Sequence, residues 1–74
     1  MQLRKINDGM YALHDLSGSH VGHFKWINGL WKFKAIGYDP HGQVLPGGAP
    51  LTDRHNTTLA ELDEALIREQ FFQE

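Results

Sequence analysis

Histidine is the residue type in this sequence with the widest chemical repertoire, and the chain of 74 residues contains five histidines and no cysteine. Imidazoles hold a divalent metal ion when three or four ligands converge on one point. His20 and His23 have opposite parity along a strand, which predicts that they point to different faces of a sheet. His14 and His23 are expected as diagonal neighbours beside three lysines, which is a poor environment for a cation. We therefore expect no metal site and no cofactor.

The densest cluster of polar side chains lies just before a predicted helix and consists of Asp53, Arg54, His55 and Asn56. Backbone amides at a helix N-terminus hold anions well, so this is the one place where we expect a small-ligand site. The alternative is that the four residues cap the helix and tie down a loop. The run from Pro46 to Pro50 lacks the Gly-Lys-Ser/Thr ending of a phosphate-binding loop. The sequence pairs no nucleophile with a base, and we expect no enzymatic activity.

Lysines are concentrated in the stretch HFKWINGLWKFKA, residues 23–35. If this stretch is a hairpin, Lys25 lies directly opposite Lys32, and two like charges in that position destabilise a sheet unless something compensates. One interpretation is a solvated face or an edge guarded against aggregation. The other is a surface that contacts nucleic-acid phosphates. The candidate residues for that surface are Lys25, Lys32, Lys34, His23, Arg4 and Lys5.

The hairpin that would position the lysines is predicted from Asn28-Gly29, which separates two runs of alternating apolar and polar residues. A type I′ turn needs positive φ at both central residues, and Asn-Gly is the pair that adopts it most readily. A two-residue loop also fixes the register, so that Trp26 opposes Trp31. Because side chains alternate between faces, the aromatic residues fall on one side and the lysines and His23 on the other.

A strand before this hairpin is predicted from the alternating residues 10–15, with a turn at Ser17-Gly18. A turn centred there places Tyr11 opposite Phe24 and Leu13 opposite Gly22. Two hairpins then agree on one apolar face, which favours a three-stranded antiparallel meander. That face consists of Tyr11, Leu13, Phe24, Trp26, Trp31 and Phe33. Val21 and Ile36 are expected on the opposite, lysine-bearing side.

A helix is predicted from about Leu59 to Phe72. Thr58 and Glu61 have the spacing of a capping box at its start. The apolar stripe of this helix and the apolar face of the sheet each need a partner, so we expect them to pack together. The stripe is expected at Leu59, Leu62, Ala65 and Leu66, widened on one side by Ala60, Ile67 and Phe71. The predicted fold is α+β, a three-stranded antiparallel meander packed on one C-terminal helix.

Length and composition indicate a single small domain over residues 1–74. Hydrophobic residues make up 41% of the chain and charged residues 22%, as in an ordinary globular domain. The absence of cysteine favours a reducing compartment, and neither a membrane span nor a signal peptide is apparent, so we expect a cytoplasmic protein with no membrane partner. The segment with Val44 and Leu45 is rich in proline and glycine, and whether it forms a fourth strand or a loop stays open.

Charge is distributed unevenly, because five basic and two acidic residues precede Ala35, whereas two basic and seven acidic residues lie from there onward. A basic sheet face backed by a helix, with a strand running into YDPHGQ (residues 38–43), resembles the AP2-like and arm-type DNA-binding domains of phage-type integrases. That resemblance implies a sheet lying in the major groove, with Lys25, Lys32 and Lys34 as the contacting residues. The long loop over residues 43–56 departs from the short strand-to-helix connection of such domains.

Two functions are consistent with these features. The first is a small non-catalytic interaction module that binds another protein or a second copy of itself through a sheet edge or the lysine-bearing face. The second is a nucleic-acid-binding domain that uses the lysines of that face. The negative total charge does not exclude the second function, because the acidic helix is expected on the opposite side, but it reduces long-range attraction of a polyanion.

Overall fold

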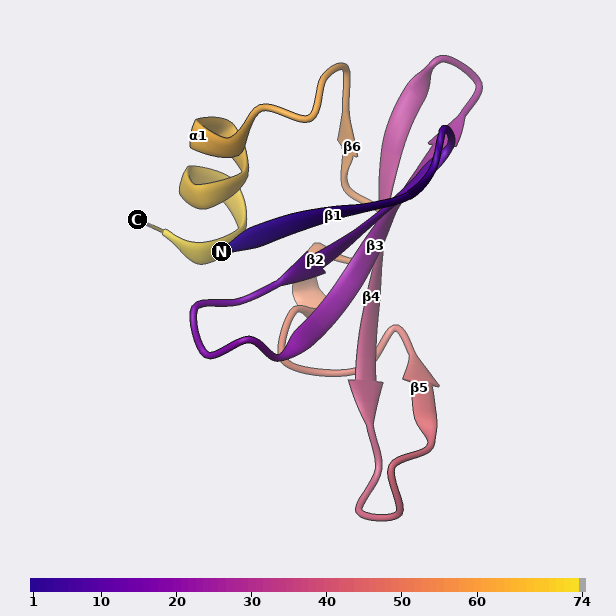
Figure 1. The fold of residues 1–74 in the computed structure, drawn as a ribbon, viewed down its shortest axis with the longest axis vertical. Coiled ribbons are helices and arrows are strands. Elements are labelled where there is room, and N and C mark those ends of the chain that lie inside the picture. The colour runs from indigo at the N-terminus through magenta and orange to yellow at the C-terminus, as the bar shows by residue number, and fades with distance from the viewer. Residues whose placement is uncertain (74) are drawn as a thin grey trace.

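A central hairpin organises the sheet in the computed structural model, which describes residues 1–73. Its strands are β3 (His20–Ile27) and β4 (Leu30–Tyr38), which run antiparallel (Figure 1). Asn28 has φ 52° and Gly29 has φ 81°, the positive values that a type I′ turn requires. Lys25 faces Lys32, and the other pairs follow the same register. The predicted hairpin is therefore confirmed in both its turn and its pairing.

Two strands precede this hairpin, β1 (Gln2–Asn7) and β2 (Met10–His14). β2 pairs with β3 so that Tyr11 faces Phe24, as predicted. β1 pairs antiparallel with β2 and has no counterpart in the predicted meander. The sheet comprises six strands, in the order β1-β2-β3-β4-β5 with β6 also on β4, so the prediction of three strands was wrong.

A β-bulge interrupts the pairing of β2 with β3. Leu13 lies opposite Gly22 and His14 lies opposite His20, so Val21 has no direct partner in the ladder. The extra residue reverses the alternation of side chains before Gly22. Val21 therefore lies in the core with no exposed surface, and its predicted place on the lysine-bearing side was wrong.

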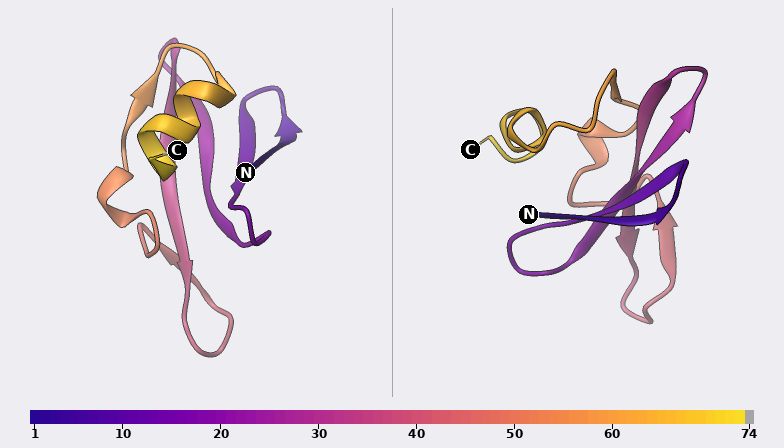
Figure 2. Two further views of the ribbon diagram at one scale, coloured as in Figure 1. Left: turned by 90° about the vertical axis from the view of Figure 1, so that its left-hand side faces the viewer. Right: turned by 45° about the horizontal axis from the view of Figure 1, so that its top comes forward.

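The far edge of β4 pairs with two short strands, β5 (Val44–Pro46) near its C-terminal end and β6 (Thr58–Leu59) near its N-terminal end. Val44 and Leu45 thus belong to a strand, which answers the question that the sequence left open. β5 and the end of β4 form a hairpin that extends away from the C-terminal helix (Figures 1 and 2).

Ala35 of β4 lies between the part of that strand that pairs with β5 and the part that pairs with β6. Its backbone hydrogen bonds on this edge are made to loop residues rather than to a strand. Its amide donates to Nδ1 of His55 at 3.0 Å, and its carbonyl accepts from the amide of Gly47 at 2.7 Å. A 3₁₀ turn, η1 (Thr52–Arg54), lies just before His55. The loop from β5 to β6 is therefore anchored to the sheet at the gap between the two strands.

The C-terminal helical segment is shorter than predicted. It consists of α1 (Glu64–Ile67) and a π-helical continuation, η2 (Arg68–Phe72). Asp63 is the N-cap, and its carboxylate accepts from the amides of Ala65 at 2.8 Å and Leu66 at 3.2 Å. The predicted capping box at Thr58 and the helical start at Leu59 were wrong, because both residues pair with β4 instead.

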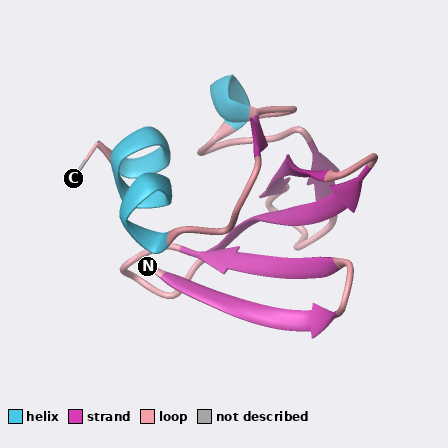
Figure 3. Ribbon diagram, turned by 90° about the horizontal axis from the view of Figure 1, so that it is seen from above, coloured by secondary structure: helices cyan, strands magenta, loops and turns pink. Residues whose placement is uncertain are grey.

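The core lies between the helical segment and one face of the sheet (Figure 3). Phe71 packs its ring against Phe24 and Phe33, with ring centroids 5.5 Å and 4.8 Å away. Ile67 is fully buried, whereas Ala65 of the predicted stripe is exposed. The helix therefore faces the sheet mainly with Ile67 and Phe71, the residues predicted to widen the stripe, while Leu62 and Leu66 of the stripe are partly buried against the core. We call the covered side of the sheet the inner face and the opposite side the outer face.

Aromatic residues of the sheet lie on the inner face as predicted, but they are not equally buried. Phe24 and Phe33 have no exposed surface, and Trp31 is partly buried. Trp26, near the hairpin tip, is 50% exposed, although its ring contacts that of Trp31 at a centroid distance of 5.2 Å. The alternation thus predicted the correct face for each ring, while the short helix leaves the hairpin tip uncovered.

Candidate functional site

The outer face carries most of the basic residues that the sequence indicated. Register and alternation place His23 and Lys34 opposite each other and Lys25 opposite Lys32 on this side. Arg4 pairs with Ala12, which in turn pairs with His23, so Arg4 belongs to the same face. Five of the six predicted residues therefore share one surface, and no helical element of the described chain covers it (Figure 2).

Lys5 is the predicted residue that does not belong to this surface. It pairs with Tyr11 and so lies on the inner-face side of β1. Its ammonium group is 3.0 Å from the carboxylate of Asp8, and both side chains are largely exposed. The hydrogen bond to Asp8, followed by the attraction of that charge, raises the pKa of Lys5.

The lysines of the outer face have no carboxylate partner among residues 1–73. The salt bridges of this part of the chain join other basic residues, namely Lys5, Arg54 and Arg68, to acids. Lys34 instead donates a hydrogen bond of 2.7 Å to the side-chain oxygen of Asn56. Since Lys25 and Lys32 are directly opposed as well, the outer face concentrates positive charge that nothing in the described chain neutralises.

Three histidines cluster on the outer face, contrary to the expectation that His20 and His23 point to opposite sides. The rings of His20 and His23 lie 4.5 Å apart between centroids, and the ring of His14 stacks on that of His20 at 5.2 Å. Nδ1 of His20 is 2.8 Å from the hydroxyl of Tyr38. The bulge at Val21 causes this difference, because it moves His20 to the side that His23 occupies. The alternation pattern contains no signal for the bulge.

Burial and mutual repulsion shape the titration of these imidazoles. Burial lowers the pKa of His20, and the nearby charge of His14 lowers it further. Burial likewise lowers the pKa of His23, with further contributions from His20, Lys25 and His14. Both effects disfavour the protonated ring. Within the described residues, no group of three or more histidine, cysteine or acidic side chains is arranged to hold a metal ion.

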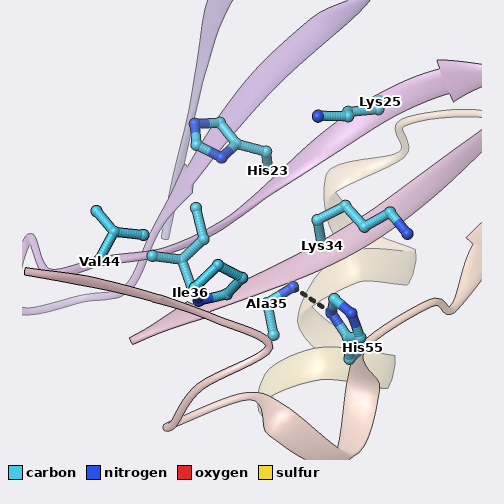
Figure 4. Close-up of a pocket in the computed structure, with 8 residues that line it drawn as sticks. His23, Lys25, Lys34, Ala35, Ile36, Val44 and His55 are labelled. Atoms are coloured by element: carbon cyan, nitrogen blue, oxygen red, sulfur yellow. Dashed lines mark hydrogen bonds between the residues drawn. The ribbon is translucent and has the colours of Figure 1, made fainter. Parts of the chain in front are cut away.

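A pocket of about 340 Å³ opens on the outer face beside the histidine cluster (Figure 4). Its wall is aliphatic on one side, where Ile36 and Val44 lie near each other, and is completed by Pro46. The other side carries basic and imidazole groups, from Lys25, Lys34, His23 and His55. This pocket could not be predicted from the sequence, because it depends on β5 pairing with the end of β4.

The polar cluster at residues 53–56 serves mainly to attach the loop. Arg54 donates from Nε to the backbone carbonyl of Gln70 at 2.7 Å and is 3.8 Å from the carboxylate of Asp53. His55 accepts from the amide of Ala35, and Asn56 accepts from Lys34. The cluster is followed by β6 rather than by a helix, so the helix amides on which an anion site depended are not there.

Comparison of the chain with protein-family models, with curated proteins and with solved structures gave no match. In residues 1–73, no helix combines the length and the apolar character needed to cross a membrane.

Proposed function

We propose that the protein is a small non-catalytic binding module and that its outer face binds the phosphates of a nucleic acid. The observation that carries this proposal is the set of unpaired cations on the uncovered side of the sheet, where Lys25, Lys32 and Lys34 have no acidic partner within residues 1–73. Neighbouring strands in a sheet lie about 4.8 Å apart, which brings these ammonium groups within reach of successive phosphates.

The arrangement also explains how a chain of net charge −2 can bind a polyanion. Acidic residues are concentrated in the C-terminal segment, and Asp63, Glu64 and Glu69 belong to the helical region on the inner side. The outer face and the acidic segment are thus separated by the thickness of the sheet. This arrangement of a basic sheet backed by a helix is the feature that suggested the AP2-like and arm-type domains, and that resemblance stays a prediction.

Salt dependence tests the proposal directly. If Arg4 and the three outer-face lysines each neutralise one phosphate, log K for a single strand should fall with log salt at a slope of about −2.8, which is about a 50-fold loss of affinity between 50 and 200 mM salt. The triple variant Lys25→Gln, Lys32→Gln, Lys34→Gln should reduce the slope to about −0.7, because only the contact of Arg4 remains. Fluorescence anisotropy of a labelled oligonucleotide measures both values.

Lys5→Gln is the matched control, because it removes one positive charge from the opposite face, where Lys5 is already paired with Asp8. This variant should bind with the slope of the parent protein. An absence of binding at 50 mM salt to any oligonucleotide, or a slope that the triple substitution leaves unchanged, would exclude phosphate binding by the outer face.

A second candidate, binding of another copy of the chain, is favoured by the open edge of β1. β1 is the first strand in the sheet order and pairs only with β2, so the backbone groups along its other edge have no strand partner in the described chain. An open edge of this kind can pair with another strand. Sedimentation equilibrium over a wide concentration range decides the question, since a monomer at every concentration would rule out self-association.

A further inference from the structure

The pocket on the outer face combines an apolar wall with a cationic one. Ile36, Val44 and Pro46 give it an apolar wall, and Lys25 and Lys34 place two ammonium groups at its opposite side (Figure 4). Among the described residues, none that lines the pocket is acidic. A ligand that fits both surfaces has an apolar, flat or compact body and carries negative charge at one end.

The pocket is also held in shape by contacts that do not involve a ligand. The imidazole of His55 is fixed because its Nδ1 accepts the amide hydrogen of Ala35, and Lys34 is tethered to Asn56 at 2.7 Å. His23 contacts His20, with ring centroids 4.5 Å apart. A pocket whose walls are already ordered loses little side-chain entropy when a ligand binds.

We infer that this pocket holds one nucleotide unit of a single-stranded nucleic acid, with the base against Ile36 and Val44 and a phosphate between Lys25 and Lys34. The inference rests on the proposed function and adds a strand preference to it. In a duplex the bases are stacked and paired, so a base enters a pocket only after extrusion from the helix, which costs free energy. An unpaired strand avoids that cost, and imidazole rings such as those of His23 and His55 offer planar surfaces for an exposed base.

Volume and charge both fit this occupant. A cavity of about 340 Å³ is near the lower end of the range for ligand pockets, which suits one nucleotide unit better than a larger ligand. The two lysines of the pocket belong to the row of outer-face cations, so a strand bound along that row passes the pocket opening. The neighbouring phosphates would then contact Lys32 and Arg4.

Filling the pocket without changing any charge tests the inference. Val44 lines the pocket and is 52% exposed, so Val44→Trp should occupy the space while leaving the core intact. We expect the affinity for a single strand to fall at least about five-fold, the lower limit for losing one stacked base, and the affinity for a duplex to change less than two-fold. Leu45→Trp is the matched control, because Leu45 is the next residue of β5, is 45% exposed and does not line the pocket. It should bind both nucleic acids like the parent.

A second measurement uses the unaltered protein and a mononucleotide. Amide and side-chain chemical shifts of Ile36, Val44 and His55 should move on addition of a nucleoside 5′-monophosphate, and should move much less with inorganic phosphate or with the unphosphorylated nucleoside. Equal shifts with inorganic phosphate alone, or none with the nucleotide, would overturn the inference. A Val44→Trp variant that binds single strands like the parent would also overturn the inference. If the lysine-dependent salt slope persisted in that variant, phosphate binding by the outer face would stand without the pocket.

Discussion

Phe71→Ala is expected to remove a large part of the stability of this protein. Phe71 is only 5% exposed, and its ring packs edge-on against Phe24 and Phe33 with centroid distances of 5.5 Å and 4.8 Å. Truncation of a buried phenylalanine to alanine costs about 3–5 kcal/mol, from lost transfer free energy and from the cavity that remains. The helical segment is far too short to be stable in isolation, so its position depends on this packing.

That cost is large compared with the total stability expected for a chain of 74 residues, which is about 4–11 kcal/mol. The melting temperature should fall by more than about 12 °C, because a domain of this size loses about 4–8 °C for each kcal/mol. Urea denaturation followed by tryptophan fluorescence gives the free energy of unfolding, and far-UV circular dichroism gives the melting curve. Trp26 and Trp31 are in ring contact at the hairpin and report on its loss.

Gln70→Ala is the control, because Gln70 precedes Phe71 in the same helical segment and is exposed. Substitution of an exposed residue normally changes stability by no more than about 0.5 kcal/mol. If Phe71→Ala unfolded at the same urea concentration as Gln70→Ala, the helix would not be docked on Phe24 and Phe33. The sheet would then have no covered inner face, and the outer face would no longer be distinguished as the exposed binding surface.

Two other predictions concern the outer face and the bulge. Burial lowers the pKa values of His20 and His23, so the unfolded chain takes up protons first as the pH falls through about 6.5. The free energy of unfolding should therefore decrease from pH 7.5 to pH 5. Urea titrations of His20→Gln should show a weaker pH dependence than those of the parent protein. Gly22→Ala should cost about 1–3 kcal/mol in the same assay, because the added Cβ would meet the ring of Phe33 and lie 2.7 Å from the carbonyl oxygen of Lys34. Gly9→Ala is its control, since the nearest atom there is 3.7 Å away. A flat pH profile, or equal stability of the two alanine variants, would contradict these expectations.

The central part of the fold was predictable because strong local signals agreed there. Asn28-Gly29 fixes a two-residue turn, and once the turn is fixed every pair from Gly22 with Ala35 to Ile27 with Leu30 follows from counting. The placement of Phe24 and Phe33 in the core then follows from alternation alone. β1 was missed even though Asp8-Gly9 is itself a hairpin signal, because Gln2–Asn7 has too few apolar residues to be typical of a strand with a buried face.

The start of the helix was predicted too early because two local preferences competed for the same residues. Thr58 and Glu61 fit a capping box, but Thr58–Leu59 pairs with β4 and thereby buries Leu59 in the core. Asp63 then provides an equally good N-cap. Sequence spacing alone could not choose between these caps, since the choice depends on an unpaired edge of β4 that only the tertiary arrangement reveals.

The histidine cluster and the pocket could not be predicted from the sequence, because alternation indicates neither the bulge that forms the cluster nor the pairing of β5 and the anchoring of the next loop on β4 that form the pocket. One unpaired residue, Val21, turns His20 onto the outer face beside His23. The gap between β5 and β6 brings His55 onto the backbone of Ala35, next to Lys34. Regular alternation therefore accounts for the cations of the outer face, whereas the partly apolar pocket beside them also requires β5 and the loop after it to lie against β4. If the pocket gives the outer face its preference for an unpaired strand, Val44→Trp should weaken that preference while leaving the lysine-dependent salt response intact, because Val44 lines the pocket whereas the lysines belong to the regular hairpin.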